Sequence, residues 1–107
     1  MTKMVESMKV FREKTKIKNM NGFHVRPATQ IAKEALTFKS LIYFYKNNEN
    51  TPIDAKSSLD IIANYFAFDD EITIECKGED AKDAILKIKE LVEKEFDFPD
   101  AHPVPKF

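Results

Sequence analysis

Apolar and polar residues alternate along two segments of the chain, and such alternation is typical of a strand with one face toward a core. In residues 11–18, every second position is basic. In residues 71–77, the apolar positions are Ile72, Ile74 and Cys76. The remaining positions of this segment are charged or polar, so we expect a strand with one wet face and with Cys76 as a small core residue.

Residues 41–46 predict another strand, and residues 53–55 a short strand that returns beside it. Ile42 and Phe44 would point toward the helices. The opposite, open face of the sheet would then carry Leu41, Tyr43 and Tyr45. Exposed aromatic side chains there would contact the N-terminal extension or the C-terminal tail, or form a protein interface, and we expect the tail to be the cover.

Apolar residues recur at helical spacing after a turn at residues 19–22. A helix is predicted from about Val25, with Pro27 in its first turn. Proline suits this position because the N–H that it lacks would have no partner within the helix there. Its apolar face comprises Ala28, Ile31, Ala32 and Ala35.

Two more helices are predicted further along the chain. The first spans residues 57–65, with Ser57 as its N-cap. Its apolar side is expected to comprise Leu59, Ile62 and Ala63. The second is long and amphipathic and is capped by Asp80. Its apolar stripe comprises Ala81, Ala84, Ile85, Ile88, Val92 and Phe96.

The predicted order of elements is β-α-β-β-α-β-α. Half-exposed strands combined with one-sided helices favour an α+β fold in two layers. We therefore expect an open-faced β-sandwich, in which a four-stranded antiparallel sheet carries three helices on one face. Residues 11–97 would form this domain, with residues 1–10 as an extension and residues 98–107 as a proline-containing tail.

Composition and charge exclude several classes of protein. The chain has 17 Lys and Arg against 18 Asp and Glu, a net charge of −1, which argues against general binding to nucleic acid or to membrane surfaces. The longest apolar run, residues 41–45, is far shorter than the ~20 residues of a membrane helix. The first ten residues lack the apolar core of a secretory signal. A single cysteine excludes an internal disulfide, so we expect a cytoplasmic protein.

The segment from Asn21 to Thr29 holds the candidate chemistry. A tight turn at Gly22 would deliver His24 to the start of a helix. The first N–H groups of a helix point outward with partial positive charge, which favours the neutral, nucleophilic form of an imidazole there. The same groups can receive phosphate oxygens, and Arg26 adds a guanidinium that pairs well with phosphate. This arrangement suits phosphoryl transfer through a covalent phosphohistidine.

The spacing alone leaves a second interpretation open, because a histidine before a helix is often an ordinary cap or surface residue. The other histidine, His102, has no second metal-ligand residue at useful spacing, so no metal site is predicted. No glycine-rich nucleotide loop or catalytic pair is present in the sequence, so an independent enzyme is not expected.

The stretch from Gly22 to Ala28 closely resembles the phosphohistidine signature of the HPr family, the phosphocarriers of the bacterial phosphoenolpyruvate-dependent sugar phosphotransferase system. Lys56 and Ser57 resemble the regulatory serine site of that family. The order of elements also agrees, so the resemblance covers about residues 13 to 96.

This resemblance implies roles for particular residues and partners. His24 would be phosphorylated on Nδ1 by enzyme I and would pass the phosphoryl group to a IIA domain, while Arg26 steadies the phosphate. Ser57 would be the target of an HPr kinase/phosphorylase, although a plain N-cap role stays open. The partner interface would include Thr29, Leu59 and Ile62. No cofactor is implied, and a monomer is expected.

Several departures from the family and two alternative functions accompany this resemblance. Asp60 and Tyr65 stand where many relatives have glycine, so the short helix and its exit must be shaped differently. One alternative is an HPr-like regulatory protein that acts only by docking. The other is a carrier in a nitrogen-type or other relay that does not serve transport.

Overall fold

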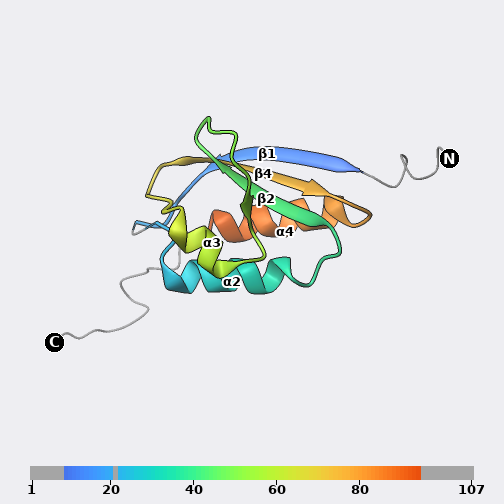
Figure 1. The fold of residues 1–107 in the computed structure, drawn as a ribbon, viewed down its shortest axis with the longest axis horizontal. Helices are drawn as coiled ribbons and strands as arrows, with labels where there is room; N and C mark the ends of the chain where they lie inside the picture. Colours follow the sequence, from blue (N-terminus) through green and yellow to red (C-terminus); the bar gives the residue numbers. More distant parts are fainter. Residues whose placement is uncertain (1–8, 21, 95–107) are drawn as a thin grey trace.

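The computed structural model describes residues 9–20 and 22–94, in which a four-stranded antiparallel sheet is covered on one face by helices (Figure 1). The strands are β1 (Val10–Lys16), β2 (Leu41–Lys46), β3 (Ile53–Asp54) and β4 (Glu71–Lys77), in the spatial order β1-β4-β2-β3. The helices are α2 (Val25–Ala35), α3 (Ser58–Ala63) and α4 (Ala81–Val92). The predicted element order and the α+β fold class are confirmed.

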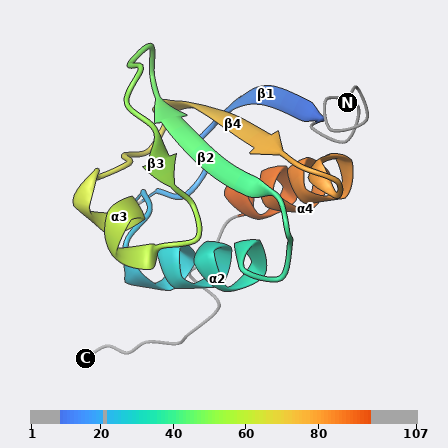
Figure 2. The same cartoon turned by 45° about the vertical axis from the view of Figure 1, so that its right-hand side comes forward.

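The core lies between the sheet and the helices (Figure 2). β4 pairs with both β1 and β2, and its register places Ile74 opposite Phe44 and Cys76 opposite Ile42. All four of these side chains are buried, as are the apolar faces predicted for α2 and for α4 up to Val92. Cys76 is the predicted core residue, and burial raises the pKa of its thiol to about 12.

The open face of β4 is not wet, and the prediction of a strand with one wet face was wrong. Thr73 and Glu75 are only 8% and 7% exposed. β4 is a central strand, so side chains from both neighbouring strands close over it. Arg12 Nε lies 3.0 Å from Glu75 Oε2, and the Tyr45 hydroxyl donates to Glu75 Oε1 at 3.3 Å. Burial, followed by the charge of Glu75, raises the pKa of Tyr45.

The apolar side of α3 also differs from the prediction. Ile61 faces the core and is fully buried, whereas Leu59 is 77% exposed and Ala63 is exposed. Ile62 is partly buried and packs against the edge of the core. A helix of six residues has fewer than two turns, so its apolar residues do not define a unique face without the neighbouring elements.

Asp80 precedes α4 as predicted, but its side chain does not cap that helix. Its carboxylate instead accepts hydrogen bonds from the backbone N–H groups of Lys39 and Ser40, at 2.8 and 2.9 Å, and from the Ser40 hydroxyl. These hydrogen bonds lower the pKa of Asp80, the one from the Ser40 hydroxyl most. Asp80 therefore ties the start of α4 to the connection between α2 and β2.

Several predictions concern residues outside those that the structure describes. They are the end of the α4 stripe at Phe96, most of the extension over residues 1–10, the tail over residues 98–107, and the cover expected on the open sheet face. None of α2, α3 and α4, the helices within residues 9–20 and 22–94, could span a lipid bilayer.

Candidate functional site

The turn before α2 is held against the segment that follows α3. The Gly22 N–H donates to the Asn19 carbonyl at 3.0 Å, and the Phe23 N–H donates to the Phe66 carbonyl at 2.9 Å. Gly22 has a φ of +69°, and a Cβ added to it would overlap the Phe66 carbonyl oxygen. Only glycine allows this approach, because it tolerates the left-handed backbone and leaves room for the carbonyl.

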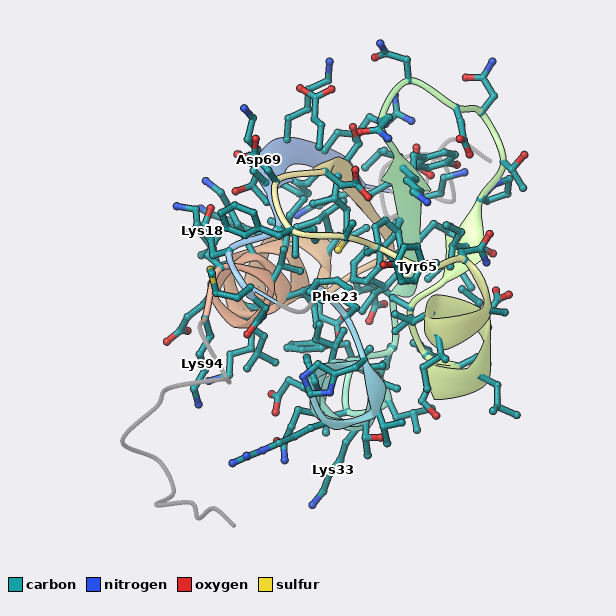
Figure 3. All side chains as sticks on the ribbon, turned by 90° about the vertical axis from the view of Figure 1, so that its left-hand side faces the viewer. Lys18, Phe23, Lys33, Tyr65, Asp69 and Lys94 are labelled. Carbon is teal, nitrogen blue, oxygen red and sulfur yellow. The ribbon has the colours of Figure 1, made fainter. Side chains whose placement is uncertain are left out.

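Phe23 anchors the same turn in the core. Its buried ring lies 5.4 Å from the ring of Phe66 and 6.4 Å from that of Phe44, measured between centroids. Figure 3 looks onto this end of the molecule and labels Phe23. Since Phe23 is fixed by both its backbone and its ring, the residue that follows it leaves the core at a defined point.

That residue is His24, the N-cap of α2, as predicted. Its backbone is extended, with φ −86° and ψ −165°, and its carbonyl accepts the Ala28 N–H at 3.1 Å. Its imidazole makes no capping hydrogen bond to the helix and is partly exposed. The side chain is therefore accessible to a partner, while the first-turn N–H groups of Val25 and Arg26 point toward the same end of α2.

Arg26 lies in the first turn of α2 and is exposed. Among residues 9–20 and 22–94 it has no ion pair or hydrogen bond with another side chain, so its guanidinium is available to an incoming anion. Thr29, one turn further along the helix, is also exposed. The structure thus brings His24 and Arg26 to one accessible end of the helix, as the spacing predicted.

Ser57 is the N-cap of α3, which confirms that part of the prediction. Its hydroxyl accepts the Asp60 N–H at 3.1 Å, and the side chain remains partly exposed. The neighbouring Lys56 is tied to the Phe38 carbonyl by its Nζ at 2.9 Å. The hydroxyl already has a structural role, so any modification of Ser57 would act on the start of α3.

One residue that supports the site was not found from the sequence. Phe66 joins the turn at Gly22 through its carbonyl and packs on Phe23 through its ring. Phe66 is far from both in the chain, and a single buried phenylalanine carries no sequence signal for such a contact.

In the part of the chain that the structure describes, no group of three His, Cys, Asp or Glu residues could hold a metal ion.

Replacing Gly22 by alanine should lower the free energy of unfolding by about 2–4 kcal/mol, because the added Cβ meets a carbonyl and the backbone is left-handed. Chemical denaturation followed by circular dichroism measures this loss. Met20→Ala is the control, since Met20 lies in the same turn and is 72% exposed, and it should cost less than about 0.5 kcal/mol. Equal midpoints for the two variants would contradict the close approach of Gly22 to Phe66.

Comparison with known proteins shows that this chain is similar to phosphocarrier proteins. The family model described as the PTS HPr component phosphorylation site matches residues 11–94. The chain is 39% identical over 71 residues to the phosphocarrier protein HPr of Mycoplasma capricolum, which covers 66% of this chain and 78% of that protein. The crystal structure of HPr from Bacillus anthracis superposes with a TM-score of 0.72 at 26% identity, covering 78% of this chain and 96% of that one.

A larger relative shares only a small part of its length with this chain. Multiphosphoryl transfer protein 1 of Escherichia coli K12 is 30% identical over 96 residues. This match includes 80% of the chain, yet the chain spans only 12% of that protein's length.

Proposed function

The chain belongs to the HPr family of phosphocarriers in the phosphotransferase system, and we propose that it carries a phosphoryl group on His24, received from enzyme I and passed to a IIA domain. The observation that carries this proposal is the placement of His24. It is the N-cap of α2, and its imidazole makes no capping hydrogen bond to the helix. The side chain is partly exposed at the start of α2, where the N–H groups of a helix can stabilise a bound phosphate.

The chemistry follows from a neutral imidazole. The lone pair of Nδ1 attacks the phosphorus, a new P–N bond forms, and the bond from phosphorus to the donor breaks with its electron pair returning to the donor. The attacking nitrogen of the neutral ring has no proton to lose. The added phosphate oxygens are stabilised by the start of α2 and by the Arg26 guanidinium. Attack by the acceptor on the same phosphorus then restores the free imidazole.

The test is phosphoryl uptake from phosphoenolpyruvate with an active enzyme I, measured by intact mass. We expect the gain of one phosphoryl group and its loss on an acid wash, since phosphohistidine is labile in acid. Transfer from the isolated phosphoprotein to a IIA domain would complete the relay. If the folded chain took up no phosphate while the enzyme I phosphorylated another HPr, the chain would instead act as a docking regulator.

The proposed partner surface combines residues of α2 and α3, two helices that pack against each other. Thr29 is exposed on α2, Leu59 is exposed on α3, and Ile62 is partly buried beside it. An exposed leucine on a surface helix suits a transient protein contact, because it adds apolar area without a permanent partner. Phosphorylation of Ser57 would add negative charge to this surface, which is how we propose that it would regulate transfer.

Replacing Ser57 by aspartate should weaken coupling to enzyme I, because it places a negative charge at the start of α3. We expect KM for this chain as the substrate of enzyme I to rise about tenfold, measured by initial rates of phosphoryl uptake. Ser57→Ala is the matched control. It removes the hydrogen bond to the Asp60 N–H and lowers stability by about 1 kcal/mol, but it adds no charge. A KM that is unchanged in Ser57→Asp would leave Ser57 as a structural cap.

A further inference from the structure

The last residue of β2 reaches across to the exit of α3. Lys46 Nζ donates to the carbonyls of Asn64 and Tyr65, at 3.1 and 2.7 Å. The same ammonium lies 5.7 Å from the ring centre of Tyr65 and 6.0 Å from that of Phe66. One cation therefore contacts three successive residues at the point where α3 ends.

This exit needs such a contact for two reasons. The carbonyls at the end of a helix have no partner within the helix, and a lysine ammonium can satisfy them. In addition, Tyr65 has a φ of +44°, a left-handed conformation that glycine adopts easily and a tyrosine does not. Lys46 makes one hydrogen bond and one cation–π contact with this strained residue itself, and its other hydrogen bond is made with the preceding Asn64.

The exit of α3 leads directly to the support of His24. Phe66 follows Tyr65. The Phe66 carbonyl accepts the Phe23 N–H at 2.9 Å and lies close against Gly22. Phe23 in turn precedes His24, the N-cap of α2. Tyr65 and Phe23 lie at the same end of the molecule, the end that Figure 3 turns toward the viewer. A continuous set of contacts thus runs from Lys46 to the residue before His24.

We propose that Lys46 is a positioning residue for His24. By clamping Tyr65 in its left-handed conformation, Lys46 holds the Phe66 carbonyl in place. This carbonyl fixes the Phe23 N–H and thereby positions the imidazole of the next residue, His24. This inference rests on the proposed phosphocarrier function for its catalytic consequence. The structural link from Lys46 to Phe23 does not depend on that function.

The first experiment compares Lys46→Met with Lys16→Met in the full chain. Methionine keeps a long apolar stem but removes the ammonium. Lys16 is the control because it also lies in the sheet and has only a 3.9 Å contact with the exposed Asp69, so both variants lose one positive charge. In Lys46→Met we expect hydrogen-exchange protection of the Phe23 N–H to fall about tenfold and the His24 ring signals in NMR spectra to move. Lys16→Met should change neither.

The second experiment asks whether the strain at Tyr65 explains the effect. Tyr65→Gly in the Lys46→Met background removes the conformational cost that Lys46 offsets. The double variant should therefore recover most of the Phe23 protection, giving a clear interaction in the double-mutant cycle. If Lys46→Met slows the chemical step of phosphoryl uptake about tenfold with little change in KM, its effect is on the position of His24.

The outcomes separate this inference from the proposed function. Unchanged Phe23 protection in Lys46→Met would overturn the positioning role, even if phosphoryl uptake slowed. Equal losses in Lys46→Met and Lys16→Met would overturn it as well, because they would show a general effect of charge. Reduced Phe23 protection together with no uptake by the wild-type chain would support the structural link and reject the carrier function.

Discussion

Replacing His24 by alanine is expected to abolish phosphoryl uptake from phosphoenolpyruvate and enzyme I while leaving the fold intact. The acceptor nitrogen disappears, and no other group at the start of α2 can form the P–N bond. The fold should survive because the imidazole makes no capping hydrogen bond to α2, and the turn is held by Phe23 and Gly22. Intact mass spectrometry measures uptake, and circular dichroism with thermal unfolding measures the fold.

The chain supplies a matched control for this experiment. It contains only two histidines, and His102→Ala removes the other one. His102→Ala should take up phosphate at the wild-type rate and give an equally acid-labile product. Undiminished phosphorylation of His24→Ala would show that the acceptor lies elsewhere and would refute the assignment.

Replacing Arg26 by alanine should slow transfer about a hundredfold without removing the acceptor. Arg26 is exposed in the first turn of α2, and it has no competing ion pair within the residues that the structure describes. We expect its guanidinium to stabilise the negative charge of the phosphoryl group mainly while that group is being transferred. The loss should therefore fall on the single-turnover rate of uptake, measured by rapid quench, more than on the affinity for enzyme I.

Two further variants show whether the guanidinium or simply its charge is needed. Arg26→Lys keeps the charge but lacks the planar pair of donors, so its rate should lie between those of the wild type and Arg26→Ala. Lys33→Ala removes a charge from the last turn of the same helix and should transfer at nearly the wild-type rate. Wild-type rates in Arg26→Ala would exclude a role in steadying the phosphate.

The start of α2 was predictable because its signals are local. Pro27 and the apolar spacing that follows it predicted a helix from about Val25, and the structure begins α2 at that residue. His24 was thereby placed at the N-cap before any contact was known. The same reasoning identified Ser57, whose hydroxyl makes the expected capping hydrogen bond. A cap depends on neighbours three or four residues away, all of which are visible in the sequence.

The failures concern neighbours that are remote in the chain. Glu75 was expected in water, but its strand lies between two others, and Arg12 and Tyr45 reach over it. Asp80 was expected to cap α4, but the N–H groups of Lys39 and Ser40 compete for its carboxylate. Neither the order of strands nor the competing donors can be deduced from residue periodicity.

Residue patterns along the chain were enough to predict the two-layer α+β fold, the core-facing sides of its long helix and strands, and the position of His24 with Arg26 at a helix start. Those properties follow from hydrophobic periodicity and local capping, which act over a few residues. The support of His24, by contrast, depends on contacts between segments that are distant in the chain. Gly22 and Phe23 rest on Phe66, and Lys46 clamps the chain at Tyr65. These contacts arise when the exit of α3 packs beside the start of α2, and folding brings these separate segments together because the buried rings of Phe23, Phe44 and Phe66 share one core.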